Sequence, residues 1–386
     1  MTRLIEVLIS LAIVAALFLV ISFVLPSSRH LTEQVETNRK LTIVYDTLNS
    51  VRRFKDWNPL VLRDPRMQLK LSGPDSGVGS RLDYESKNQS LGTGSWEIVE
   101  SEPGKSVTYA ITDPHRGHDK RSTFIFKPTG HSGRNIEITQ LYDVVYGWDL
   151  LGRYAGLYVA RHVGDDMKMG LDRLANLLTT VPNVDYRMQG SNWTDFRTVD
   201  VPAEHLLVVN AGSIARDPDK LAASMKANTE WIKRSMESSG LVAAGPMRII
   251  STEFGRENYT FDVAQPVRRG GVAKAADKTG TDKTGGTDKA GTDAVAAAAA
   301  PESTFAPLTG LKLQGPVKAV DTKAGRSAVV SYTGYLMGLE NVHNALRAWV
   351  LTQGLEVVDR PWDVYKNGID QAITENGQYD VYWKLK

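Results

Sequence analysis

Histidine and acidic side chains gather in one segment of this 386-residue chain, but their spacing does not define a catalytic or metal site. His115, His118 and His131 lie near Asp113 and Asp119, in stretches expected to be hairpin loops. A zinc site needs three or four such ligands to converge with supporting hydrogen bonds, and the spacing here matches no zinc pattern. The chain has no cysteine, which removes thiolate nucleophiles, disulfides and cysteine-ligated metals. We therefore expect neither a metal nor a cofactor.

Two other motifs that could do chemistry are weak. Gly104-Lys105-Ser106 resembles the end of a phosphate loop, but Val99 stands where the first glycine is required and strands are expected on both sides. A Ser-His-Asp site could be assembled from residues distant in the sequence, although no nucleophile-elbow pattern supports one. The aromatic residues Trp57, Trp96 and Trp148 are either cavity walls or ordinary core.

Asp363 is the acidic residue with the most unusual setting. It stands between Trp362 and Tyr365 on a predicted strand that is otherwise apolar. A buried carboxylate without a partner is costly, so such a residue points to a ligand site. A solvated position at a sheet edge is the alternative.

The elements that must position these residues begin with an apolar run over residues 4–25, in which Glu6 is the only charge. At about 1.5 Å per residue this helix reaches about 33 Å, enough to cross a hydrocarbon core of about 30 Å. A signal peptide usually has an apolar region of only about 7–15 residues, and no clear cleavage site follows here. We predict a retained single-pass anchor, with a cleaved signal or a buried helix as alternatives.

The side of the membrane is less well defined. Lys and Arg near the ends of the run mildly favour a cytoplasmic body, whereas large bodies behind such anchors are commonly exported. We expect a bacterial inner membrane with a periplasmic body, the orientation being open. The net charge of +2, with both signs well mixed, indicates no nucleic-acid partner.

Behind the anchor, residues 29–182 read as one α+β domain. A strand at 29–39 precedes a helical stretch at 41–62 that breaks at Asn58-Pro59, and six short alternating segments follow up to residue 146. Apolar residues then recur at helical spacing over 150–181, where Pro182 ends the pattern. This order predicts a curved antiparallel sheet that wraps a long final helix and leaves a cavity between them.

This region resembles the START-like, polyketide-cyclase superfamily with the helix-grip fold. The resemblance rests on residues 44–48 (VYDTL), 54–59 (FKDWNP), 77–80 (GVGS) and 94–103 (GSWEIVESEP). It implies a cup for an apolar ligand, in a family of which only some members are enzymes.

After a connector at 183–196, residues 197–386 carry an internal duplication of strand, helix, strand, strand. The first copy has a strand at 197–210, a helix between Asp217-Pro218 and Gly240, and strands at 247–250 and 259–263. The second copy has the same elements at 327–332, 338–353, 362–365 and 379–383. Between them, residues 268–304 are rich in small polar residues with balanced charge, which predicts a disordered insertion.

This second half resembles the gyrase-inhibitor-like effector-binding domain, through residues 329–335 (VVSYTGY), 346–349 (LRAW) and 361–365 (PWDVY). The resemblance implies that an acidic residue in an aromatic groove meets cationic or polar ligands. Asp363 occupies that position, where the family more often has Glu, and the first copy has Ile249-Ile250 instead.

Together these features predict a membrane-anchored protein that binds small amphipathic or lipid-like molecules in two cup-like domains without catalysis. The expected ligand-binding residues are Trp57 and Trp96 in the first domain and Tyr332, Tyr335, Trp362, Asp363 and Tyr365 in the second. The alternatives are a hydrolase or cyclase acting on a hydrophobic molecule, with a buried carboxylate as base, and a scaffold whose cavities are filled by side chains. The oligomeric state is open.

Overall fold

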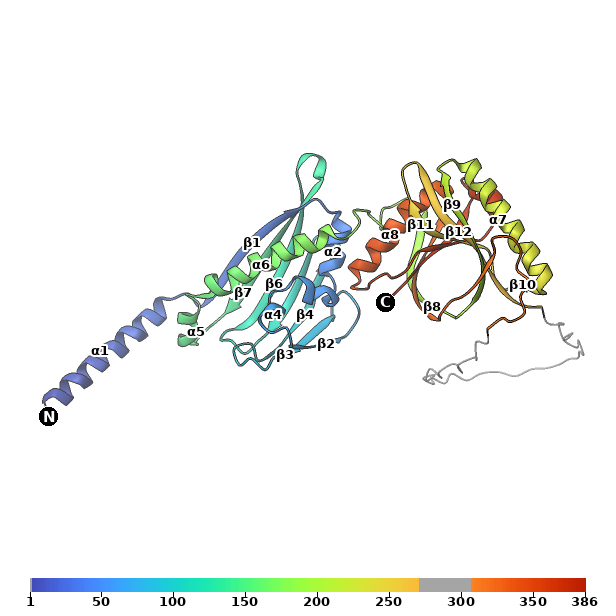
Figure 1. Cartoon of the computed structure of the whole chain (residues 1–386). Helices are drawn as coiled ribbons and strands as arrows, with labels where there is room; N and C mark the ends of the chain where they lie inside the picture. The colour runs from blue at the N-terminus through green and yellow to red at the C-terminus, as the bar shows by residue number, and fades with distance from the viewer. Residues whose placement is uncertain (1, 271–306) are drawn as a thin grey trace, which may run out of the picture.

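The computed structural model describes residues 2–270 and 307–386. A long helix, α1 (Thr2–Val24), projects from one end of the body, and the two folded regions follow one behind the other (Figure 1). Within the described residues, Arg3–Val24 is the one helix long and apolar enough to cross a membrane, and only 6% of its most apolar window is buried. A signal sequence passes the same test, so the retained anchor stays a prediction.

The first sheet is antiparallel throughout, as the alternating segments predicted. Its seven strands, in spatial order, are β1 (Ser28–Thr37), β7 (Asn135–Val145), β6 (His118–Thr129), β5 (Ser106–Thr112), β4 (Thr93–Glu102), β3 (Arg81–Glu85) and β2 (Gln68–Ser72). On β7 every second residue is buried, from Ile136 to Val144, because successive side chains of a strand point to opposite faces.

Two predicted helices of this domain are interrupted. The stretch at 41–62 is four short elements: α2 (Leu41–Leu48), η1 (Val51–Arg53), α3 (Phe54–Trp57) and α4 (Leu60–Arg63). The stretch at 150–181 is α5 (Leu150–Ala155) followed by α6 (Val159–Thr179). Gly156 stands at the second break, where a Cβ would lie 2.9 Å from Tyr146 Cε2, so the turn packs directly on an aromatic ring. Helix α6 lies along the sheet, which gives the mixed α+β arrangement of a helix-grip fold (Figure 1).

The second sheet curls round on itself (Figure 1). Its main path runs β13 (Lys318–Asp321), β9 (His205–Ala215), β12 (Asn258–Arg269), β11 (Arg248–Phe254), β15 (Trp362–Tyr365), β16 (Gln378–Lys384), β14 (Gly325–Thr333) and β8 (Trp193–Val201), and β10 (Leu241–Ala243) pairs with β12. Helices α7 (Pro218–Ser239) and α8 (Leu339–Thr352) share one core with the sheet. The expected caps of α7 are present: Asp217 accepts from the Lys220 backbone N–H, and Gly240 is left-handed.

The predicted single strand at 197–210 is wrong, because Pro202 ends β8 and β9 begins only at His205. Proline has no backbone N–H to donate to a neighbouring strand, so β8 ends at this point. β8 lies at one edge of the sheet, and the chain then crosses to β9, which lies near the opposite edge. Strand β8 also begins inside the predicted connector. Three strands of each predicted copy are neighbours, β9-β12-β11 and β15-β16-β14, and the two sets meet between β11 and β15. This order is compatible with a duplication, which remains a prediction.

The two folded regions share an interface at the C-terminal end of α8. Arg53 Nη1 donates to the Leu351 carbonyl at 2.6 Å. Tyr186 OH donates to Asp46 Oδ2 at 2.7 Å and lies 2.9 Å from Thr352 Oγ1. Part of the connector, at Tyr186, is therefore buried.

The predicted insertion at 268–304 lies outside the described residues apart from 268–270, and 268–269 end strand β12.

Candidate functional site

A cavity of about 530 Å³ lies in the first domain, lined mainly by the sheet, the α3–α4 segment, α6 and the end of α5. Its volume falls within the range of about 300–1,000 Å³ that is usual for small-molecule sites. The walls are largely apolar and aromatic; they include Trp57, Tyr84, Leu91, Trp96, Ile111, Tyr142, Tyr146, Val163 and Met167. The two tryptophans expected at a ligand site therefore both line this cavity.

The tryptophans are held by other aromatic rings. The Trp57 ring packs edge-on against Phe54 and Phe124, with centroids 5.5 and 5.6 Å apart. The Trp96 ring lies 5.1 Å from Phe54 and 5.7 Å from Tyr109. The Trp57 indole Nε1 is buried without a hydrogen-bond partner in the described structure. A buried donor left unpaired costs about 1–3 kcal/mol.

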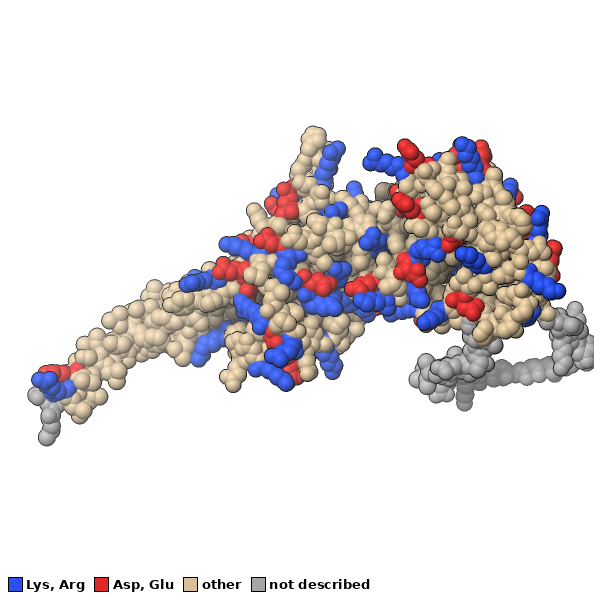
Figure 2. All heavy atoms as spheres, viewed as in Figure 1, with Lys and Arg blue, Asp and Glu red and all other residues tan. Residues whose placement is uncertain are grey.

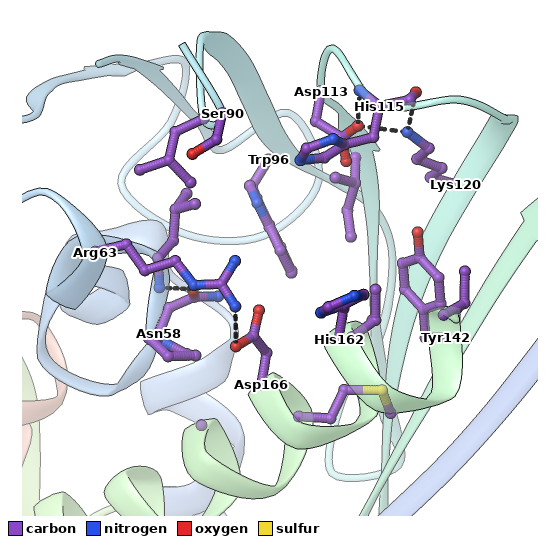
Figure 3. Close-up of a pocket in the computed structure, with 18 of the residues that line it drawn as sticks. Asn58, Arg63, Ser90, Trp96, Asp113, His115, Lys120, Tyr142, His162 and Asp166 are labelled. Atoms are coloured by element: carbon purple, nitrogen blue, oxygen red, sulfur yellow. Dashed lines mark hydrogen bonds and ion pairs between the residues drawn. The ribbon is translucent and has the colours of Figure 1, made fainter. Parts of the chain in front are cut away.

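Polar groups at one rim of the cavity come from the turn between β5 and β6 (Figure 3). The Lys120 ammonium is buried and donates to an Asp113 carboxylate oxygen and to the His115 carbonyl, the latter at 2.7 Å. Gly117 forms the turn at φ +95°, and a Cβ there would overlap Val144 Cγ2. The charge of Lys120 is therefore neutralised by Asp113 of the same cavity wall.

Across the cavity, Asp166 of α6 faces the α4 side chain Arg63, and His162 lies one turn earlier on α6 (Figure 3). Arg63 Nη2 donates to Asp166 Oδ1 at 2.6 Å. Burial raises the pKa of the Asp166 carboxyl, and Arg63 opposes that rise. Gln140 on β7 donates to Ser122 Oγ at 2.9 Å, so it too has a protein partner.

Tyrosine hydroxyls supply further polar surface in the cavity. Burial, and secondarily Asp113, raises the pKa of Tyr84 to about 12. Burial also raises the pKa of Tyr142 well above its ordinary value. Both hydroxyls stay protonated at neutral pH and can donate hydrogen bonds. Such groups orient a ligand without adding charge.

The other histidines noted in the sequence do not join this site. His118 pairs with the adjacent Asp119 at 2.7 Å on an exposed turn, and His131 is exposed in the β6–β7 turn. Among the residues that the structure describes, no three His, Asp or Glu side chains are grouped to hold a metal ion.

Asp363 lies in the interior of the second domain. Strand β15 runs between β11 and β16, and the Asp363 side chain is fully buried, so a solvated sheet edge is wrong. His343 Nε2 of α8 lies 2.6 Å from Asp363 Oδ1, and Ser251 Oγ donates to Oδ2 at 3.4 Å. The sequence reasoning missed this histidine, which stands on the buried face of α8 among apolar residues.

The three tyrosines predicted beside Asp363 have different settings. Tyr365 is buried on the same face, and its hydroxyl has no partner in the described structure. Its ring meets Tyr379 edge-on at 4.9 Å, and Tyr332 stacks on the other side of Tyr379 at 5.6 Å. Tyr332 OH donates to the Tyr335 carbonyl at 3.1 Å, whereas the Tyr335 side chain is exposed. The structure thus brings Asp363 close to a buried tyrosine cluster that excludes Tyr335's ring.

Trp362 points to the opposite face of the sheet, as strand alternation requires. It lines a second cavity of about 850 Å³ on the face away from α7 and α8. The buried Arg248 guanidinium lies over the Trp362 ring, 6.0 Å from its centroid, and donates to Glu204 Oε2 at 2.7 Å. Arg360 donates to Asp262 Oδ2 at 2.8 Å in the same wall. A ligand cup that includes Trp362 was expected in this domain, but the other residues of this cavity were not predicted, because they come from strands that are distant in the sequence.

Comparison with known proteins finds one family similar to the first domain. Residues 28–179 match the model of the family described as "Polyketide cyclase / dehydrase and lipid transport". No curated protein sequence matches the chain.

Several solved structures are similar at low scores. The crystal structure of the EcmrR C-terminal domain is 12% identical, with a TM-score of 0.34, and the match covers 50% of this chain and 97% of that one. Truncated norcoclaurine synthase from Thalictrum flavum is 13% identical (TM-score 0.32; 39% and 93% covered). Protein Ms6760 from Mycobacterium smegmatis is 20% identical (TM-score 0.28; 39% and 91% covered). A fold can host many functions, so the function has to be argued from the site.

Proposed function

We propose that this chain is a membrane-anchored protein that binds a small amphipathic or lipid-like molecule in the cavity of its first domain, without catalysis. The observation that carries the proposal is the cavity of about 530 Å³ with aromatic walls, whose charged groups already have ion-pair partners in the protein. Its apolar walls would supply the affinity, and the hydroxyls of Tyr84 and Tyr142 would orient the ligand. The lipid-transport description of the matching family supports the same class of ligand.

The second domain is part of the proposal. The cavity beside Trp362 is large enough for a second ligand. Its walls carry the Arg248–Glu204 ion pair and further charged side chains, which favour a polar molecule there. The predicted ligand contacts of Asp363 and Tyr365 would require α8 to move away, because both side chains are covered by the domain core.

The binding proposal is tested with two matched variants of α6. Val163→Trp places a large ring in the cavity wall, whereas Met169→Trp places the same ring on an exposed position of the same helix. Native mass spectrometry of the full chain released from detergent micelles should show a retained amphiphile on the wild type and on Met169→Trp, but not on Val163→Trp. A wild-type protein without any adduct, or equal adducts on all three proteins, would overturn the proposal.

A hydrolase or cyclase is the second candidate function, and one observation favours it. Asp166 is a carboxyl in the cavity wall whose pKa is raised by burial, as a general base requires. Turnover of a panel of hydrophobic esters and epoxides that disappears in Asp166→Asn, but survives in Asp165→Asn, would favour the enzyme over the binding protein.

We also propose a bacterial inner membrane with the body on the periplasmic side. A pair of topology reporters fused after Lys386, one active only in the periplasm and one only in the cytoplasm, decides between the two orientations.

A further inference from the structure

The end of the first domain nearest α1 exposes large apolar side chains. Around α5, Trp148, Leu151, Leu157 and Tyr158 are 82%, 54%, 48% and 62% exposed. We call these four residues the α5 apex. Figure 1 shows that α1 leaves the body beside α5, at the opposite end from the second domain. In Figure 2 the tan surface of α1 continues onto this end of the body, with Lys and Arg at its margins.

Helix α5 is fixed against the last turns of α1. The Tyr154 ring stacks on Phe18 with centroids 4.5 Å apart, and Tyr154 OH donates to the Phe18 carbonyl at 3.0 Å. Arg153 Nη1 donates to the carbonyls of Ser22 and Leu25 at 3.2 and 3.3 Å, which satisfies groups left free at the end of α1. If α1 spans a membrane, its position therefore sets the depth at which α5 lies relative to the bilayer.

The depth of α5 along α1 can be compared with the thickness of a bilayer. The span Arg3–Val24 has 22 residues. At about 1.5 Å per residue it measures about 33 Å, so its ends lie close to the borders of a hydrocarbon core of about 30 Å. Phe18 lies six residues before Val24, the last residue of α1. It is thus about 9 Å below that end, similar to the depth of about 5–10 Å at which amphipathic elements rest in a membrane interface.

The side chains of the α5 apex suit that position. Tryptophan and tyrosine are enriched where hydrocarbon meets head groups, because one end of each ring is apolar and the other is wet. The Trp148 ring also meets Phe23 of α1 edge-on at 6.2 Å, which makes the apex continuous with the apolar surface of the helix. In water these side chains would form an exposed apolar patch, which soluble surfaces avoid.

The same segment forms part of the cavity. Ala155, the last residue of α5, lines it together with Tyr158, Val159 and His162, which follow α5 in the chain. We propose that the α5 apex inserts into the bilayer interface and that the cavity receives its ligand from the membrane itself. The inference rests on the proposed anchoring and deepens the proposed binding. A cavity of about 530 Å³ fits a single-chain amphiphile better than a two-chain phospholipid.

The chain's lack of cysteine makes the test direct, because single cysteines can be labelled with an NBD fluorophore in the full chain. Three exposed positions are compared: Ile13→Cys in the middle of α1, Leu151→Cys in the α5 apex, and Val78→Cys in the β2–β3 turn at the far end of the domain. Each labelled chain is reconstituted into phosphatidylcholine–phosphatidylglycerol vesicles that contain nitroxide lipids at shallow or deep positions.

We expect deep nitroxides to quench Ile13→Cys, shallow nitroxides to quench Leu151→Cys, and neither to quench Val78→Cys. If Ile13→Cys is quenched while Leu151→Cys behaves like Val78→Cys, the anchor stands and the insertion of the apex is refuted. If Ile13→Cys is not quenched, the anchoring proposal fails and this inference fails with it.

A second measurement tests ligand entry. The double variant Trp148→Ser, Leu151→Ser leaves the cavity walls intact, since neither residue lines the cavity. It should slow uptake of pyrenedecanoic acid from vesicles several-fold while leaving the equilibrium amount bound unchanged. An unchanged uptake rate would overturn direct entry from the membrane.

Discussion

The contact between Asp363 and His343 offers the sharpest test of how the second domain is held together. Replacing His343 by Leu leaves the Asp363 carboxylate fully buried, with Ser251 at 3.4 Å as its one remaining hydrogen-bond partner among the described residues. Removing one member of a buried pair costs about 3–5 kcal/mol, whereas replacing both by apolar residues is often nearly neutral. We therefore expect His343→Leu to lose about 3–5 kcal/mol, and the double variant His343→Leu, Asp363→Leu to recover most of that loss.

Hydrogen exchange followed by mass spectrometry measures the effect locally. Because about 1.4 kcal/mol corresponds to a factor of ten in an equilibrium constant, amides of β15 and β16 should exchange about two to three and a half orders of magnitude faster in His343→Leu. Amides of β6 and β7 in the first domain serve as the internal control. A single variant that costs less than about 1 kcal/mol, or a double variant as unstable as the single one, would refute the reasoning that Asp363 depends on this histidine.

Three further predictions concern the first domain. Gly117→Ala forces an L-residue to a positive φ and crowds Val144, so we expect a loss of at least about 1–2 kcal/mol, seen as a fall in Tm. Burial raises the pKa of Asp46 above its ordinary value of 3.8, with Arg187 opposing. Between pH 3.8 and the raised pKa, the folded state therefore binds more protons at Asp46 than the unfolded state does, so stability falls as the pH rises through this range. Asp46→Asn should flatten this part of a Tm–pH profile. Arg153→Ala removes one of the two sets of contacts that hold α5 to α1 and leaves those of Tyr154, so the NBD group at Leu151→Cys should become less quenched by shallow nitroxide lipids.

Much of the fold could be predicted because local signals and packing agree. Alternating burial along β7 and the caps of α7 at Asp217 and Gly240 were both readable in the sequence. The break at Asn58-Pro59 was readable too, but the further division of residues 41–57 was not, since it depends on tertiary contacts such as the packing of Trp57 against Phe124 of the sheet. Apolar spacing alone cannot distinguish one long helix from several short ones on the same face.

The candidate site was predictable only in part. Trp57 and Trp96 stand out as large aromatics near turns, and both line the first cavity. Strand alternation shows that Trp362 and Asp363 face opposite sides, but it does not say which side the helices cover. The structure shows that α8 covers the side of Asp363, because His343 of α8 contacts the Asp363 carboxylate. Partners of this kind are set by tertiary contacts and leave no local pattern.

Helix α8 has a consequence for how the protein is made. Ala345 and Ala348 belong to the core of the first domain, while Leu346 and Val350 belong to the core of the second. During synthesis, the first domain emerges long before α8, so part of its core stays uncovered until α8 has been translated. Strand β16, at the C-terminus, then completes the sheet on which α8 rests. A ribosome that stops early would therefore release a first domain with an open apolar flank, and a chaperone or the membrane surface would have to shield it.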